Sequence, residues 1–205
     1  IDYKKKDILI FMTIYALSSG SGISGISVIR VSGPETKKVI EKLSQGRFPK
    51  PRVATLKKIN VINSKELIDE GIIIWFPGPN SYTGEDMAEF HLHGSRAVIL
   101  ALQTSISQIK GCRLAEPGEF TKLALQNNKI NLLKAESIGD LIKSETEIQR
   151  KQAIKMMSGA NISKFDNWRE KLVKILSNIE AKIDFPEEDL PLEILKNLKI
   201  DAKKI

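Results

Sequence analysis

The residues best suited to chemistry lie in one short segment, residues 79–95, which opens with Pro-Asn-Ser-Tyr-Thr-Gly-Glu-Asp and closes with His-Leu-His-Gly-Ser. It holds both histidines of the chain, His91 and His93, and the carboxylate of Glu89. If residues 87–93 form a strand, these three side chains share one face, because alternate residues of a strand point the same way. Loops held by rigid strands commonly bind ligands. We therefore take this segment as the candidate site.

Two kinds of ligand match this face. Two histidines and a carboxylate at two-residue steps can hold a metal ion, but the chain has no further histidine to complete a zinc set. Glu89 presents two acceptor oxygens, which match the paired N–H donors of a guanine-like or pterin ring. Arg30, or a lysine from another segment, could hold the acidic end of such a ligand. Hydrogen bonds within a half-buried sheet explain the histidines without a ligand, and a surface salt bridge explains each charged residue, so the residues favour small-molecule binding only modestly.

The elements that position these side chains are predicted to form a mixed sheet with flanking helices, an α+β fold. Arg30 lies between the apolar residues Ile29 and Val31, so strand alternation places it on the face opposite to theirs. The glycine-rich residues 18–27 lack the Gly-Lys-Ser/Thr ending of a phosphate loop, so a flexible turn is the simpler interpretation. The pattern predicts strands at residues 13–17, 28–33, 55–62, 70–76 and 87–93, and a short strand or extended link at 111–115. It predicts helices at residues 34–43, with Val39, Ile40 and Leu43 facing inward, at 95–109, with Ser95 as a candidate N-cap, and at 117–128.

From about residue 130 onward the sequence has only helical patterns. Residues 132–143 are predicted to form a helix, and Ser144 with Glu147 has the spacing of a capping box for the next one. Gly159 either lies inside one long helix or interrupts it. The last helix is predicted to end at an Asp-Phe-Pro run. Its apolar residues recur mostly at three- and four-residue steps, as in a coiled coil, and predict self-association if exposed: Ile162, Phe165, Trp168, Leu172, Leu176, Ile179 and Ile183.

The 205 residues include 32 basic and 25 acidic side chains, which give a net charge of +7. This excess suits a polyanionic partner such as RNA, and a solvated lysine-rich surface explains it equally well. The single cysteine, Cys112, rules out an internal disulfide and indicates a reducing compartment, and a buried structural role is favoured over a nucleophilic one. No apolar run approaches the ~20 residues that cross a bilayer, and no signal-peptide cleavage site follows the first residues. We therefore expect a cytoplasmic protein without a membrane partner. Because the chain starts without Met and ends within a helical pattern, we also expect it to be part of a longer protein.

Eight motifs in this order resemble the amino-terminal part of the MnmE (TrmE) family of tRNA-modifying GTPases, over residues 12–189. The most specific are Pro-Asn-Ser-Tyr-Thr-Gly-Glu-Asp and Glu-Pro-Gly-Glu-Phe-Thr. The motifs occupy residues 13–18, 28–33, 76–86, 90–94, 113–121, 129–132, 135–138 and 183–188. The resemblance implies a folate-binding and dimerising domain at residues 12–129, similar to the tetrahydrofolate-binding domain of the glycine-cleavage T-protein. It also implies that residues 130–205 begin a helical domain into which a GTPase domain is inserted, while residues 1–11 have no family counterpart.

The resemblance further implies a function and a set of site residues. The folate contacts of the family fall on Arg30, Glu89 and Lys129, which would bind a tetrahydrofolate derivative such as the 5-formyl or 5,10-methylene form. The implied protein is a homodimer that acts with the FAD-containing partner MnmG (GidA) to modify carbon 5 of the wobble uridine of certain tRNAs. GTP, Mg²⁺ and K⁺ would belong to the GTPase domain, so no catalytic residue is expected in this chain.

Three features depart from the family pattern. Residues 22–25 lack the basic residue that is usual in the glycine loop, the chain holds no Gly-x-x-x-x-Gly-Lys-Ser/Thr phosphate loop, and Cys112 does not match the functional cysteine of the family. Two alternatives therefore stay open. One is a stand-alone folate-binding module of the T-protein type, and the other is a structural fragment for dimerisation and tRNA docking.

Overall fold

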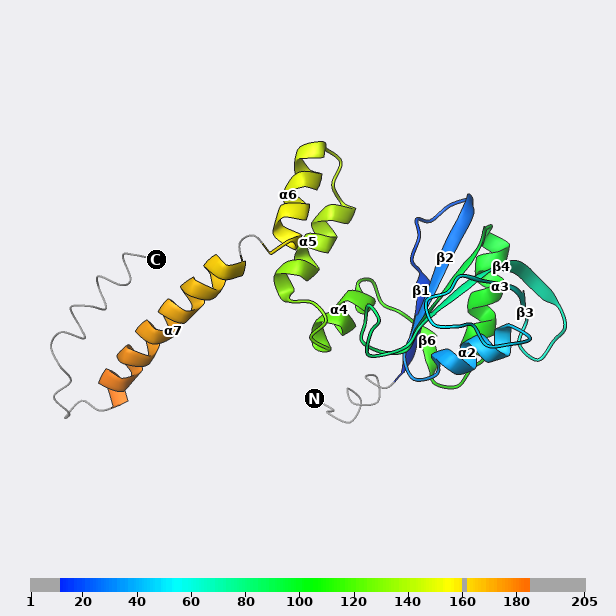
Figure 1. The fold of residues 1–205 in the computed structure, drawn as a ribbon, viewed down its shortest axis with the longest axis horizontal. Coiled ribbons are helices and arrows are strands. Elements are labelled where there is room, and N and C mark those ends of the chain that lie inside the picture. The colour runs from blue at the N-terminus through cyan, green and yellow to red at the C-terminus, as the bar shows by residue number, and fades with distance from the viewer. Residues whose placement is uncertain (1–11, 160–161, 185–205) are drawn as a thin grey trace. The chain divides into compact units, whose positions relative to one another are not determined.

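The computed structural model describes residues 12–159 and 162–184, and the chain divides into two compact units, Ile1–Asn131 and Leu132–Ile205 (Figure 1). We call them unit 1 and unit 2 and describe each by itself. The predicted extension at residues 1–11 and the Asp-Phe-Pro run after the last helix lie outside the described residues, apart from the aspartate, Asp184.

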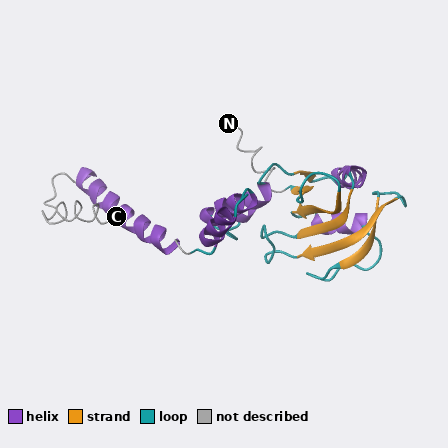
Figure 2. Cartoon of the chain, turned by 90° about the horizontal axis from the view of Figure 1, so that it is seen from above, coloured by secondary structure: helices purple, strands orange, loops and turns teal. Residues whose placement is uncertain are grey.

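Unit 1 is built on a mixed six-stranded sheet with the strand order β3-β4-β5-β2-β1-β6. Neighbouring strands run antiparallel, except that β1 and β6 are parallel. Figure 2 shows the curved sheet from a second direction. The strands are β1 (Thr13–Leu17), β2 (Ser24–Ser32), β3 (Thr55–Asn60), β4 (Leu67–Phe76), β5 (Met87–Gly94) and β6 (Cys112–Leu114).

The core lies between one face of this sheet and two helices, α2 (Thr36–Leu43) and α3 (Arg96–Ser107). A third helix, α4 (Glu119–Gln126), follows β6. The predicted apolar positions of α2 are all buried, and Ser95 caps α3 by accepting a hydrogen bond from the backbone N–H of Val98, as expected for serine at this position. The core contains Ile29, Val31, Val39, Ile40, Leu43, Ile73, Ala88, Phe90, Leu102 and Ile106, each fully buried.

The opposite face of the sheet, which we call the open face, carries the residues that alternate with the core. Arg30 and Glu89 lie on it, as strand alternation predicts. The strand register also places Leu56 beside Ile72 and Ile72 beside His91 on this face. Leu56 is 66 % exposed and Ile72 is 38 % exposed. Two apolar side chains are therefore open to a partner on the face that holds the candidate site.

Three predicted boundaries of unit 1 are corrected by the structure. Strand β2 begins at Ser24, inside the predicted loop, because Ser24 pairs with Gly94 of β5 beyond a bulge. Helix α2 begins at Thr36 rather than at Pro34. Helix α4 begins at Glu119 after Gly118, whose φ is +77°, so Pro117 lies before the helix and not in its first turn.

Unit 2 contains the helices α5 (Leu132–Ile142), α6 (Glu147–Met157) and α7 (Ile162–Asp184), and α5 packs against α6. The predicted capping box at Ser144 is wrong by two residues. Thr146 caps α6 together with Gln149, while the hydroxyl of Ser144 donates to the carbonyl of Leu141. Gly159 follows the end of α6 with a φ of +80°, so it interrupts the helical path.

The apolar residues of α7 remain open to solvent in the described chain. Leu172 is 54 % exposed and Leu176 is 55 % exposed. The predicted seam is therefore an exposed apolar surface that could contact another helix. The exposed residues of this seam are Phe165, Trp168, Leu172, Leu176, Ile179 and Ile183. Within residues 12–159 and 162–184, no helix combines the length and the apolar character that crossing a bilayer requires. The predicted fold class, a mixed sheet with flanking helices followed by a helical segment, is confirmed.

Candidate functional site

The centre of the candidate site is an ion pair between two neighbouring strands. Arg30 of β2 and Glu89 of β5 are directly paired in the antiparallel register. The guanidinium donates from Nη2 to Oε1 of Glu89 at 2.9 Å, and from Nε to the same oxygen at 3.2 Å. The side chains are 26 % and 17 % exposed, so both charges are partly desolvated and attract each other more strongly than they would in water.

Two aromatic rings border this pair. The guanidinium carbon of Arg30 lies 5.4 Å from the ring centroid of Tyr82 and 5.6 Å from that of Phe120. Tyr82 belongs to the loop before β5, and Phe120 belongs to α4. Cation–π attraction stabilises a guanidinium at these distances. Phe120 belongs to the Glu-Pro-Gly-Glu-Phe-Thr motif, but the sequence did not indicate that it lies beside Arg30, because the two residues meet only through the fold.

The loop that joins β4 to β5, residues 77–86, is held in one shape by its own polar groups. Asp86 accepts a hydrogen bond from the backbone N–H of Gly78 at 2.9 Å and forms an ion pair with Lys37 at 3.1 Å. The hydroxyl of Ser81 donates to the carbonyl of Glu85 and accepts from the N–H of Gly84. The peptide bond between Gly78 and Pro79 is cis. The hydrogen bonds and the ion pair named above give the loop a defined shape.

Two long-range hydrogen bonds attach this loop to the rest of unit 1 at Thr83, which is fully buried. Its hydroxyl lies 2.7 Å from the hydroxyl of Ser32 at the end of β2. Its carbonyl accepts from Nδ2 of Asn127, just after α4, at 2.6 Å. Tyr82 contributes a third link, because its hydroxyl lies 2.9 Å from that of Thr121. These contacts bring α4 and the residues after it to the loop.

Lys129 follows two residues after Asn127, which attaches this segment to the loop. A Cβ added to Gly84 would lie 2.9 Å from Cε of Lys129, so the lysine side chain runs over the glycine of the loop. Gly84 has a φ of +84°, a backbone conformation that favours glycine. The structure therefore brings together Arg30 and Glu89 in direct contact and places Lys129 on the loop that carries Tyr82.

Glu85 is a further carboxyl group beside the candidate site. Burial raises its pKa, and a hydrogen bond from the hydroxyl of Ser32, at 3.1 Å, only partly offsets that effect. A raised pKa means that this carboxyl group takes up a proton at a higher pH than an exposed glutamate does, and shifted pKa values are common at functional sites. The Glu-Asp pair that closes the first motif was the only signal for it in the sequence.

The two histidines have separate partners. Nε2 of His91 lies 3.3 Å from Oε2 of Glu89, on the side of the carboxylate away from Arg30. Nδ1 of His93 lies 2.9 Å from Oδ1 of Asp69 on β4. Burial pushes the pKa of Asp69 upward, but hydrogen bonds from His93 and Glu70 outweigh it and lower the pKa overall. Among the described residues, no group of three His, Cys, Asp or Glu side chains is arranged to hold a metal ion.

Cys112 lies at the edge of the core. Burial raises the pKa of its thiol to about 11, and the charge of Glu35 acts in the same direction. A thiol with so high a pKa is almost entirely protonated near neutral pH, and only the thiolate is a strong nucleophile. Cys112 is therefore a poor nucleophile, but it is half-buried and not the fully buried residue that the sequence predicted.

These observations define a class of protein. A mixed sheet has helices on one face and, on the other, a cross-strand Arg–Glu pair with aromatic borders, and a helical unit follows it. The sequence model described as "GTP-binding protein TrmE N-terminus" matches residues 13–129, and the one described as "MnmE helical domain" matches residues 132–205. The chain belongs to this TrmE/MnmE family and contains sequence of its amino-terminal and helical domains.

Curated relatives agree with this assignment. The chain is 73 % identical over 188 residues to the tRNA modification GTPase MnmE of Pelagibacter ubique (strain HTCC1062), which covers 92 % of this chain and 42 % of that protein. It is 46 % identical over 186 residues to the protein of the same name from Rickettsia rickettsii (strain Sheila Smith), and the match covers 91 % of this chain and 42 % of that protein. The mitochondrial 5-taurinomethyluridine-[tRNA] synthase subunit GTPB3 of Danio rerio is 46 % identical over 178 residues, with 87 % and 35 % covered. The chain thus spans less than half the length of these relatives.

Proposed function

We propose that this chain is the folate-binding and dimerising part of a GTPase that modifies the wobble uridine of tRNA. The observation that carries the proposal is the Arg30–Glu89 pair on the open face, within a chain of the TrmE/MnmE family. The relatives are named as tRNA modification GTPases, which supports the wider function. The FAD-containing partner MnmG, a cytoplasmic location, and the GTP, Mg²⁺ and K⁺ of the GTPase reaction belong to the same proposal and rest on the family.

The residues around the pair fit a reduced folate. A pterin ring has a flat apolar face and a row of N–H donors on one edge. Tyr82 and Phe120 supply aromatic borders, and Glu89 supplies the acceptor oxygens. Oε1 of Glu89 already accepts two hydrogen bonds from Arg30, whereas Oε2 has one longer contact, with His91. A carboxylate has about four acceptor positions, so Glu89 retains capacity for a ligand. When bound, the folate would supply the one-carbon unit of the modification.

Lys129 would hold the acidic end of the ligand. Folate carries carboxylates at the end opposite to the pterin ring, and an ammonium group is a mobile point charge suited to such a group. The lysine is exposed, and its stem lies over Gly84. Because Asn127 attaches this segment to Thr83, the lysine is held at the same loop that carries Tyr82.

Dimerisation is proposed to use the open face. Leu56 and Ile72 are neighbours there and are exposed to solvent, so a second copy that covered them would remove apolar surface from water. A ligand bound at Arg30 and Glu89 would then lie beside the contact between the two copies.

Titration of 5-formyltetrahydrofolate into the chain, followed by calorimetry, tests the proposal. We expect Glu89→Ala to lower the affinity by about tenfold or more, because an unpaired ligand N–H in a half-buried site costs about 1–3 kcal/mol. Glu66→Ala, which removes an exposed carboxylate from the turn between β3 and β4, is the matched control and should bind as the parent does. Equal affinity of the parent and Glu89→Ala would remove Glu89 from the site.

A structural role is the second candidate, and one observation favours it. Arg30 and Glu89 satisfy each other's charge, so the pair is complete as a cross-strand bridge without a ligand. In that case the parent, Glu89→Ala and Glu66→Ala would all fail to bind the folate, while Glu89→Ala would still lower the stability of the fold.

A further inference from the structure

The positive charge of the chain is concentrated in one stretch of unit 1. From Lys37 to Lys65 the sequence holds nine Lys and Arg residues and a single acidic residue, Glu41. Residues 66–131, by contrast, hold five basic and eight acidic residues. The net charge of the whole chain is +7, so this stretch accounts for all of the excess. We call its nine cationic residues the basic edge: Lys37, Lys38, Lys42, Arg47, Lys50, Arg52, Lys57, Lys58 and Lys65.

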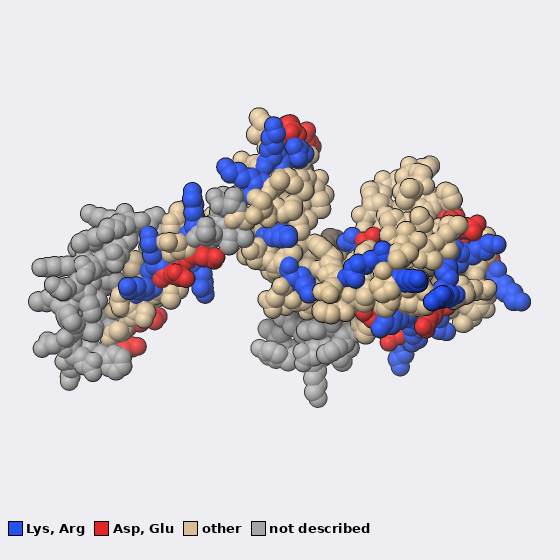
Figure 3. All heavy atoms as spheres, viewed as in Figure 1, with Lys and Arg blue, Asp and Glu red and all other residues tan. Residues whose placement is uncertain are grey.

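The fold brings most of the basic edge to one border of the sheet. The end of α2 reaches β3, the edge strand, through a bridge between Ser44 and Ile59, and the loop after α2, β3 itself and the turn after β3 complete this border. Lys37 and Lys38 lie at the other end of α2, beside Asp86 and Glu35. Nζ of Lys57 donates to the carbonyls of Gln45 and Arg47, at 3.1 and 2.6 Å, and so attaches the loop to β3. Figure 3 shows Lys and Arg side chains in a band across the part of unit 1 that holds these elements.

Most of these cations have no acidic partner of their own. Within the described part of the chain, only Lys37 and Lys38 of the basic edge form ion pairs, with Asp86 and Glu35. Elsewhere in unit 1, Arg30 and Arg113 are each paired with a glutamate. Because its charges are not neutralised internally, the basic edge presents a positive potential to an external anion.

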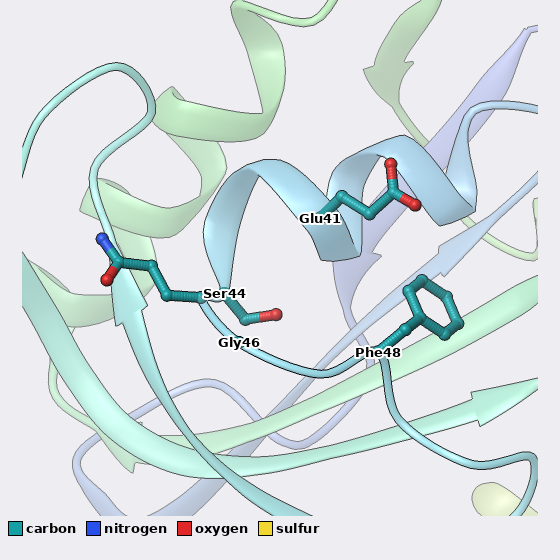
Figure 4. A pocket seen from close by; sticks show the side chains of 5 residues that line it. Glu41, Ser44, Gly46 and Phe48 are labelled. Atoms are coloured by element: carbon teal, nitrogen blue, oxygen red, sulfur yellow. The ribbon is translucent and has the colours of Figure 1, made fainter.

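Two hollows lie along the basic edge, and their linings differ. The larger, about 840 Å³, is lined by Lys57, Lys58 and Lys65, with Glu70 as the acidic residue of its lining. Leu56 and Leu67 also line it, so it borders the open face at Leu56. The smaller, about 340 Å³, lies at the end of α2 and is lined by Glu41, Ser44, Gln45, Gly46 and Phe48. Figure 4 shows the carboxylate of Glu41 projecting from the helix beside the ring of Phe48. The smaller hollow has this carboxylate and no cation in its lining, whereas the larger has three cations against one carboxylate, so the larger hollow is the one suited to an anionic ligand.

We propose that the basic edge binds the phosphate backbone of RNA. This inference rests on the proposed function, because tRNA is the polyanion with which such a protein must interact. Phosphate contacts of this kind orient a nucleic acid without reading its sequence. The cations that line the larger hollow come from β3 and the turn after it, and cations around a hollow suit a nucleic-acid strand that follows a groove better than they suit a flat membrane surface.

Fluorescence anisotropy with a labelled tRNA transcript tests the proposal on the full chain. The variant Arg47→Glu/Lys58→Glu/Lys65→Glu reverses three exposed charges of the basic edge. The control Arg96→Glu/Lys110→Glu/Lys122→Glu reverses one Arg and two Lys that are exposed elsewhere in unit 1, so the net charge changes equally. At about 100 mM salt we expect the first variant to lose about tenfold or more in affinity and the control to lose at most about threefold.

Two further readouts make the outcome decisive. The slope of log affinity against log salt should become shallower by about 2 to 3 in the first variant, since each lost phosphate contact removes about 0.9. Glu70→Gln removes the acidic residue of the larger hollow and should raise the affinity for RNA. Equal losses in the two triple variants, or no loss in either, would overturn the proposal. The proposal would also be overturned if these residues bound phosphatidylserine vesicles and did not bind tRNA.

Folate binding separates this proposal from the proposed function. The first triple variant should still bind 5-formyltetrahydrofolate as the parent does, because none of its three positions contacts Arg30 or Glu89. Glu89→Ala should bind tRNA normally. If the parent chain binds tRNA but not 5-formyltetrahydrofolate, the proposed function is wrong and the RNA-binding proposal stands. If the parent chain binds 5-formyltetrahydrofolate but not tRNA, the RNA-binding proposal is wrong and the proposed function stands.

Discussion

Arg30 and Glu89 occupy directly paired positions on β2 and β5, and the guanidinium of the one donates twice to a single oxygen of the other. Two residues that are 59 positions apart in the sequence thus form one charged unit on the open face of the sheet. The contact has consequences for stability that are separate from any ligand.

The first prediction concerns the coupling between these two side chains. In a double-mutant cycle with Arg30→Ala and Glu89→Ala, we expect a coupling free energy of about 1 kcal/mol, because cross-strand charge pairs contribute up to this amount. Urea denaturation of the four proteins measures it. The exposed pair of Lys38 with Glu35 on α2 is the comparison and should show no measurable coupling. Equal coupling in the two cycles would contradict the prediction.

The second prediction concerns Gly84, over which Lys129 lies. Gly84→Ala and Gly118→Ala both place a side chain at a positive φ, +84° and +77°, so each should cost about 1 kcal/mol of stability. Only at Gly84 does the new Cβ meet another side chain, since nothing lies within 4 Å of the position at Gly118. Folate titration should therefore show weaker binding for Gly84→Ala alone, because Lys129 must move and Asn127, whose Cβ is 3.2 Å from the new Cβ, is crowded as well. A matching loss in Gly118→Ala would show that strain, and not the lysine, sets the affinity.

The third prediction concerns pH. Hydrogen bonds from Arg113 lower the pKa of Glu119, and they outweigh the opposing effect of burial. A carboxylate with a lowered folded-state pKa stabilises the fold above its unfolded pKa and loses that contribution as the pH falls through the folded value. Arg113→Met should therefore cost about 2 kcal/mol at neutral pH. The cost should shrink as the pH falls below 4.5, the ordinary value for glutamate.

Thermal or urea unfolding between neutral and acid pH measures this effect. Arg150→Met, which breaks an exposed pair with Glu147 on α6, is the control and should leave the pH profile nearly unchanged. A constant cost for Arg113→Met at every pH would mean that packing, and not charge, explains the loss.

The fourth prediction concerns the exposed seam of α7. Leu172→Glu/Leu176→Glu should raise the dissociation constant for self-association of the chain by about tenfold or more, because each change removes exposed apolar surface and adds a charge. Analytical ultracentrifugation over a range of concentrations measures it. Lys171→Glu/Lys174→Glu alters the polar positions of the same helix and should have a smaller effect. A parent chain that is monomeric at all concentrations would contradict the prediction.

Local pattern was enough to identify much of the fold. The alternation at residues 87–93 was sufficient to place Glu89, His91 and His93 on one face, because the pleat of a strand assigns faces by position alone. The N-cap at Ser95 followed from the chemistry of its side chain. The boundaries that were wrong, at Ser24 and Glu119, depend on a partner strand and on a backbone angle at Gly118, and short-range patterns report neither.

The candidate site itself shows the same division. The sequence determined that Arg30 and Glu89 point away from the core, and its motifs indicated the family and, with it, Lys129. Only the tertiary structure decided that Arg30 and Glu89 pair with each other, that His93 pairs with Asp69 instead of sharing a ligand with Glu89, and that Asn127 holds the loop at Thr83. Each of these contacts joins residues 24 to 59 positions apart, so they depend on strand register and loop attachment, which the chain acquires only when it folds.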